Sequence, residues 1–225
     1  MSLKPSIIRY FLISSIALNL IALCFAVRRL YYTQVDFMKQ PEFYPAEQRE
    51  RFAELPINTS DIVFIGDSEI EYFNTSELLP GMPIKNRGIG GDNVKELYSR
   101  IPDVLKYHPR KLFIEIGTND IHGKTSIDSF AFYIQKTIQI TKKMSPSTSI
   151  FCLSILPRQS LYKEQVINFN NILKTSSTRS GATFIDVYNQ FSSNGTLNKI
   201  YDCGDSLHLN AKAYTAWSAL LKPYL

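Results

Sequence analysis

Four short blocks of glycine and polar residues have the composition of a hydrolytic site. They are Gly66-Asp67-Ser68, Gly88-Ile89-Gly90-Gly91-Asp92, Gly117-Thr118-Asn119-Asp120 and Asp205-Ser206-Leu207-His208. Together they supply a hydroxyl nucleophile, an imidazole base with an aspartate close before it, and NH groups that can stabilise an oxyanion. Each block alone is typical of a turn or a helix cap. Four of them in this order indicate serine-dependent ester hydrolysis.

Five residues of these blocks have a predicted role. Ser68 is the predicted nucleophile, and His208 is the base, because an imidazole titrates near neutral pH. Asp205 is expected to accept a hydrogen bond from the other imidazole nitrogen and so to fix the tautomer. The predicted oxyanion donors are the Ser68 and Gly90 amides and the Asn119 side chain.

Residues beside the blocks are weaker candidates. His122 follows Asn119 closely and is a candidate for substrate contact, whereas Glu69 and Arg87 are better interpreted as surface residues. The chain has three cysteines, Cys24, Cys152 and Cys203. They show no CxxC spacing, so we expect free thiols and predict neither a metal site nor another cofactor.

The charge is concentrated at the N-terminus. Residues 1–30 contain four basic residues and no acidic one, so the remaining chain carries only +1 of the net charge of +5. A nearly neutral domain is a poor match for a phosphate backbone, and no nucleic-acid partner is expected. The oligomeric state stays open.

The same N-terminal part contains a long apolar run. No formal charge occurs from Tyr10 to Val27, and as a helix this run would measure about 27 Å, close to the thickness of a bilayer core. The pattern predicts an uncleaved single-pass transmembrane helix within residues 1–30. The side of the membrane is poorly determined; the catalytic domain is expected to be extracytoplasmic.

The rest of the chain alternates short apolar runs with helical patterns. Strands are expected at 61–66, 82–87, 111–117, 148–156 and 182–187, and helices at 92–107, 126–144, 160–178 and 210–221. This alternation predicts an α/β fold with a five-stranded parallel sheet, in which ligands bind beyond the carboxyl ends of the strands. Residues 31–57 form a predicted connector with a helix, and residues 58–225 the catalytic domain.

These motifs resemble those of the SGNH hydrolases, also called GDSL-type lipases and esterases. The four signature residues of that family match Ser68, Gly90, Asn119 and His208, and the resemblance covers about residues 58–225. Three segments are similar to the branch of platelet-activating factor acetylhydrolase Ib catalytic subunits and bacterial acetylesterases: residues 88–92, 156–158 and 207–209. The resemblance implies a flavodoxin-like three-layer α/β/α fold and metal-free acyl hydrolysis. Glu69 departs from the leucine of the family name.

Three functions are weighed. The leading one is a membrane-anchored serine esterase that removes short acyl groups, acetyl first, from carbohydrate or other small esters. A lysophospholipase, thioesterase or acyltransferase is the alternative, because an anchor would bring the site close to lipid. A catalytically silent binding module would be favoured by a lost motif residue, and none is lost.

Overall fold

The computed structural model describes residues 15–29 and 43–225. The chain divides into two compact units, Met1–Tyr44 and Pro45–Leu225.

In the first unit, residues 15–29 form a helix in which the Asn19 side chain donates a hydrogen bond to the Ser15 carbonyl. A helix of this length measures about 22 Å, against about 30 Å for the hydrocarbon core of a bilayer. Among the described residues, none of the helices is long and apolar enough to cross a membrane. This finding overturns the predicted transmembrane helix and, with it, the predicted single-pass membrane location. Residues 10–14 of the predicted span and 31–42 of the predicted connector lie outside the described residues.

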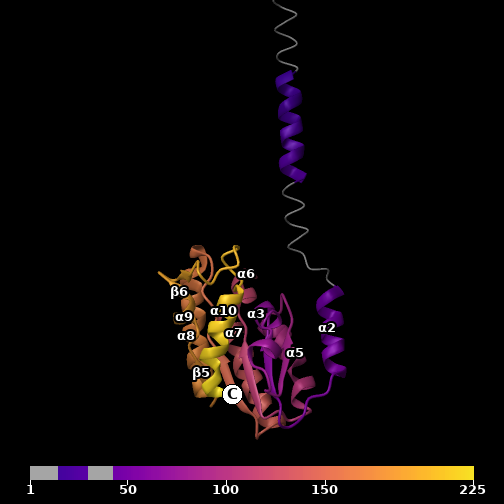
Figure 1. Cartoon of the computed structure of the whole chain (residues 1–225), viewed down its shortest axis with the longest axis vertical. Coiled ribbons are helices and arrows are strands. Elements are labelled where there is room, and N and C mark those ends of the chain that lie inside the picture. The colour runs from indigo at the N-terminus through magenta and orange to yellow at the C-terminus, as the bar shows by residue number, and fades with distance from the viewer. Residues whose placement is uncertain (1–14, 30–42) are drawn as a thin grey trace, which may run out of the picture. The chain divides into compact units, whose positions relative to one another are not determined.

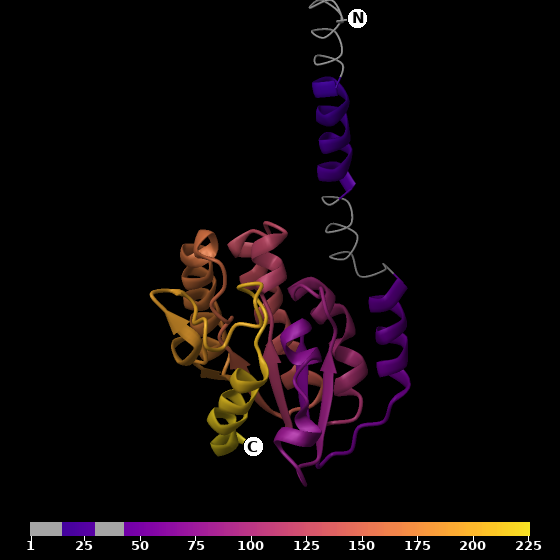
Figure 2. The same cartoon turned by 45° about the horizontal axis from the view of Figure 1, so that its top comes forward.

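The second unit is built on one sheet. Its strands are β1 (Ile62–Gly66), β2 (Ile84–Gly88), β3 (Lys111–Glu115), β4 (Ser149–Leu153) and β5 (Thr183–Ile185). All neighbours are parallel, in the order β2-β1-β3-β4-β5, which is the flavodoxin-like order. The five-stranded parallel sheet is thus confirmed. Figure 2 shows the strands side by side, with the yellow loop that precedes the last long helix at the end where the strands finish.

Helices cover both faces of this sheet, and the central strand β1 is buried along its whole length. Val63 and Ile65 face a core formed with α5 (Val94–Leu105), α7 (Ile127–Met144) and α8 (Lys163–Arg179). Ile62 and Phe64 face the opposite core, which includes α3 (Ser68–Glu71) and α10 (Ala211–Leu221). The two cores and the sheet between them make a three-layer α/β/α arrangement (Figure 1).

The remaining elements are short, apart from the N-terminal helix of the domain. They are α2 (Phe43–Glu54), α4 (Thr75–Leu78), α6 (Thr118–His122), η1 (Ser160–Tyr162), α9 (Tyr188–Phe191), the hairpin of β6 (Ser192–Ser193) and β7 (Thr196–Leu197), and η2 (Lys222–Tyr224).

Local chemistry fixes where the long helices begin. The Asn93 side chain accepts hydrogen bonds from the Lys95 and Glu96 amides, and the Glu96 carboxylate accepts one from the Asn93 amide, which completes a capping box. Asn210 caps α10 by accepting a hydrogen bond from the Ala213 amide. The Asn210 cap sets the start of α10 directly after the loop that carries His208.

Candidate active site

Ser68 lies immediately beyond the carboxyl end of β1, as the first residue of α3. Asp67 is the N-cap of this helix, and its carboxylate accepts a hydrogen bond from the Glu69 amide at 3.1 Å. Position 66, the last of the strand, requires glycine because a Cβ there would collide with the backbone carbonyl of Glu115 on β3. The tight packing of Gly66 on β3 therefore fixes the position of Ser68, which follows two residues later.

The structure brings Ser68, His208 and Asp205 together. Ser68 Oγ lies 3.1 Å from His208 Nε2, although the two residues are 140 positions apart. His208 Nδ1 lies 2.6 Å from Asp205 Oδ2. The other carboxylate oxygen accepts hydrogen bonds from the Leu207 and His208 amides, at 2.9 and 2.8 Å. These contacts orient the imidazole between a hydroxyl and a carboxylate, and the catalytic role of the three residues stays a prediction.

The Asp205 carboxylate is charged at neutral pH. Burial by itself would raise its pKa, but the hydrogen bonds from the His208 side chain and from the His208 and Leu207 amides lower it more. The net effect holds the pKa of Asp205 below its usual value of 3.8. The imidazole therefore has an ionised partner, although 45% of the Asp205 side chain is exposed.

The loop that carries His208 is held by its own hydrogen bonds. Asp202 Oδ1 accepts from the Gly204 and Ser206 amides at 2.7 and 2.9 Å. The Cys203 amide donates to the His208 carbonyl at 3.0 Å, and the Asn210 side chain donates to the Asp202 carbonyl at 3.1 Å. The loop is thus preorganised although most of its residues are exposed.

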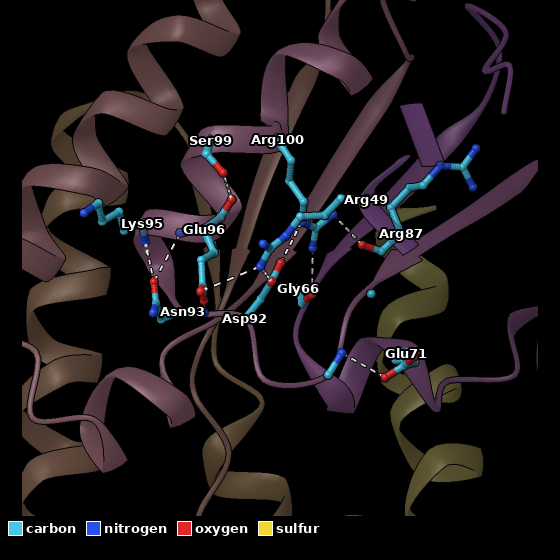
Figure 3. Close-up of polar contacts among 12 residues, drawn as sticks. Arg49, Gly66, Glu71, Arg87, Asp92, Asn93, Lys95, Glu96, Ser99 and Arg100 are labelled. Atoms are coloured by element: carbon cyan, nitrogen blue, oxygen red, sulfur yellow. Dashed lines mark hydrogen bonds and ion pairs between the residues drawn. The ribbon is translucent and has the colours of Figure 1, made fainter. Parts of the chain in front are cut away.

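The two remaining predicted donors lie in neighbouring loops. The Asn119 side chain donates to the Asp92 carbonyl at 3.0 Å, which ties the loop after β3 to the loop after β2. The Gly90 amide donates to the Glu71 carboxylate at 2.8 Å, and Figure 3 draws a dashed line at the labelled Glu71. Glu71 is on the same short helix as Ser68. The predicted oxyanion amide therefore already contacts a carboxylate oxygen.

A buried guanidinium joins these loops to the sheet (Figure 3). Arg100 donates through Nε to Asp92 at 2.6 Å, through Nη1 to the Arg87 carbonyl at 2.8 Å and through Nη2 to the Gly66 carbonyl at 3.0 Å. Arg49 of α2 donates to the other Asp92 carboxylate oxygen at 2.7 Å. The Arg100 side chain thereby connects the ends of β1 and β2 with the loop after β2.

Sequence reasoning missed Arg100 and Glu71, although both positions carried a signal. Arg100 is three residues after Leu97 and therefore lies on the buried side of its helix. Glu71 is three residues after Ser68, one turn along the same helix.

Three acidic side chains beside Ser68 are buried. Burial raises the pKa of Asp67 to about 7 and that of Glu69 to about 8, and it raises the pKa of Glu115 well above its usual value. The Tyr214 hydroxyl donates to Glu69 Oε2 at 3.0 Å. The interpretation of Glu69 as a surface residue was wrong, because its side chain enters the core between the sheet and α10 instead of facing solvent.

Arg87 is also buried, contrary to the prediction. Its guanidinium lies over the Phe52 ring, 5.0 Å from the centroid, and donates to the Leu55 carbonyl at 3.3 Å. The side chain is covered by α2 and the residues that follow this helix. The sequence predicted a helix in the connector but not its contact with Arg87.

His122 is exposed and contacts Tyr162, with Nδ1 3.3 Å from the tyrosine hydroxyl. The Arg158 guanidinium lies 4.1 Å from the centroid of the Tyr162 ring and donates to the Thr118 carbonyl at 2.8 Å. These contacts attach α6, which carries Asn119, to the segment after β4. A contact between His122 and substrate stays a prediction.

The described cysteines are poor competitors for the role of nucleophile. Burial raises the pKa of the Cys152 thiol to about 12. Burial and the nearby Asp205 charge also raise the pKa of Cys203. A thiol attacks as its thiolate, so neither Cys152 nor Cys203 is activated at neutral pH.

The GDSL-like lipase/acylhydrolase family matches residues 73–216, and the chain belongs to this family. It is a carboxylic ester hydrolase. The match begins five positions after Ser68 and includes His208. The contact between Ser68 Oγ and His208 Nε2 therefore links this serine to the matched region.

Solved structures of similar fold cover most of the chain. A protein from Streptococcus pneumonia, provisionally named a platelet activating factor, is 28% identical over 89% of this chain and 98% of its own, with a TM-score of 0.74. An acetylxylan esterase from Geobacillus stearothermophilus is 17% identical over 73% of this chain and 94% of its own, with a TM-score of 0.62, and shares the fold. No curated protein matches the chain.

Proposed function

We propose that the chain is a serine esterase that hydrolyses short-chain esters, acetyl esters of carbohydrates first among them, with Ser68, His208 and Asp205 as the catalytic triad. One observation carries the proposal: the unbroken series of contacts from Ser68 Oγ through the imidazole to the Asp205 carboxylate, at 3.1 and 2.6 Å. A hydroxyl becomes a useful nucleophile only when an oriented base removes its proton, and this series supplies both base and orienting group.

The reaction follows from these roles. His208 Nε2 takes the Ser68 proton while Oγ attacks the ester carbonyl, and Asp205 stabilises the imidazolium that forms. The imidazolium then protonates the leaving alcohol, which leaves an acyl group on Ser68. Water, deprotonated by the same imidazole, attacks this acyl-enzyme and releases the acid and the free serine.

The oxyanion of each tetrahedral intermediate needs NH donors. We assign this role to the Ser68 and Gly90 amides and the Asn119 side chain. The contact between the Gly90 amide and Glu71 supports the assignment, because a carboxylate oxygen already occupies a position that an oxyanion would take. Substrate must displace this carboxylate before its own oxygen can accept the hydrogen bond.

The preference for acetyl esters on carbohydrate rests on the likeness to the Geobacillus acetylxylan esterase. A series of p-nitrophenyl esters from acetyl to palmitoyl tests it. We expect the highest kcat/KM for the shortest acyl groups; an optimum at long chains would make lipid esters the substrates and overturn the acetyl preference.

The nucleophile is tested by Ser68→Ala. We expect hydrolysis of p-nitrophenyl acetate to fall on the order of 10⁶-fold, since a triad without its nucleophile keeps little activity. A fluorophosphonate should label the unmodified protein on Ser68 and leave the variant unlabelled. Ser99→Ala, which changes an exposed serine of α5, is the matched control. Undiminished turnover or labelling in folded S68A protein would refute the assignment.

A further inference from the structure

The loop before α10 gathers a thiol, a carboxylate and an imidazole at one point. Cys203, Asp205 and His208 each present one ligand atom, and all three atoms lie within 4.8 Å of one another. Cys203 and Asp205 are exposed and the His208 side chain is partly exposed, so the group is open to solvent. The esterase mechanism uses Asp205 and His208 but gives Cys203 no role.

These three groups are the ligand types that zinc prefers. Thiolate sulfur, imidazole nitrogen and carboxylate oxygen all bind Zn²⁺, and three protein ligands can hold the ion with a water in the fourth position. The sequence showed no CxxC spacing, so the site was not predicted. It is formed within six residues, because the turn at Gly204 and Ser206, both with positive φ, folds the loop back on itself.

From this geometry we propose that Cys203, Asp205 and His208 bind Zn²⁺ and that the bound metal inhibits the esterase. Two ligand atoms on one tetrahedral zinc are about 3.3 Å apart, given metal–ligand bonds of about 2.0–2.1 Å. His208 Nδ1 and Asp205 Oδ2 are 2.6 Å apart. Binding therefore separates these atoms and removes the hydrogen bond that orients the imidazole toward Ser68.

Zinc and catalysis thus compete for the same imidazole. A metal on Nδ1 holds His208 as a ligand and takes the Asp205 charge away from the imidazolium that must form during attack. The inhibitory effect rests on the proposed function, whereas binding of the metal does not. The two can therefore be tested separately.

The first measurement is inhibition of p-nitrophenyl acetate hydrolysis by Zn²⁺, with the full chain in a non-chelating buffer. We expect inhibition that EDTA reverses, and a rise of at least about tenfold in the inhibitory concentration for Cys203→Ser, because even indirect ligand partners change metal affinity about 10–100-fold. Each protein is compared with its own metal-free rate. Cys24→Ser, at an exposed cysteine far from position 203 in the sequence, is the matched control.

The second measurement does not depend on activity. Co²⁺ replaces Zn²⁺ at such sites and gives a cysteinate-to-cobalt charge-transfer band in the near ultraviolet. We expect this band for the unmodified chain and C24S and its loss in C203S. A band that persists in C203S, or equal zinc inhibition of C203S and the unmodified chain, would overturn the proposal. If the unmodified chain binds cobalt and the S68A variant still turns over substrate, the metal site stands and only the proposed esterase mechanism is refuted.

Discussion

Asp205 allows a test in which two substitutions of the same residue must differ. Its Oδ1 atom accepts two backbone hydrogen bonds, from the Leu207 and His208 amides, while Oδ2 faces His208 Nδ1 at 2.6 Å. An asparagine has only one acceptor oxygen. If this oxygen keeps the two backbone bonds, the NH₂ group faces Nδ1 and turns that nitrogen into an acceptor.

The consequence for catalysis is a change of tautomer. With Nδ1 as an acceptor, the neutral imidazole carries its proton on Nε2, which then cannot take the Ser68 proton. The opposite amide orientation would place NH₂ against two backbone N–H donors and is unfavourable. Asp205→Asn therefore locks the wrong tautomer, a fault that costs about 10⁴-fold in kcat in serine proteases.

Asp205→Ala removes the partner without imposing a tautomer. A hydrogen bond to a charged group contributes about 1.5–3 kcal/mol, or about 10- to 150-fold in rate. Because 45% of the side chain is exposed, we expect the lower part of this range. D205N should then be slower than D205A by at least about tenfold.

The assay is kcat/KM for p-nitrophenyl acetate, with ¹⁵N NMR of the imidazole to identify the tautomer. Asp202→Asn, which disturbs a carboxylate that holds the same loop but does not contact the imidazole, measures the cost of loosening the loop. If D205N is as active as D205A, or if both retain full activity, the reasoning on the tautomer is refuted.

Three further predictions concern groups around the site. Glu71→Ala should raise kcat/KM up to about tenfold, because substrate no longer displaces a carboxylate oxygen from the Gly90 amide; a lower kcat/KM would argue against Gly90 as an oxyanion donor. Glu69 has a pKa of about 8 instead of 4.5, so the native state keeps a proton that the unfolded chain releases, and the free energy of unfolding falls as pH rises through this window. Glu69→Gln should flatten that fall in thermal melts between about pH 5 and 8, and an unchanged slope would contradict the buried acid. Arg100→Lys should lower the free energy of unfolding by about 3 kcal/mol in urea titrations, since two carbonyl groups lose charged donors of about 1.5 kcal/mol each. Arg51→Lys, at an exposed ion pair, should change it by less than about 0.5 kcal/mol, and equal effects would contradict the role of Arg100.

Much of the fold was predictable because its signals are local. Short apolar runs marked the strands, and the helical patterns between them marked the long helices. The N-terminal prediction failed although its signal was also local. An apolar run shows which residues are apolar but does not set the length of the helix that they form. The described helix of residues 15–29 is too short for the predicted span.

The sequence by itself determined the parts of the site: a serine after a strand, an aspartate and a histidine in one late loop, and glycine and asparagine after two more strands. Tertiary structure alone decided how these parts meet. The strand order places the ends of β1, β2 and β3 side by side, and the loop before α10 brings His208 to Ser68 across 140 residues. It also decided that Glu71 contacts the Gly90 amide and that Cys203 joins Asp205 and His208. Periodicity and capping describe neighbours along the chain, whereas these contacts depend on packing between elements distant in sequence or on the path of a folded loop.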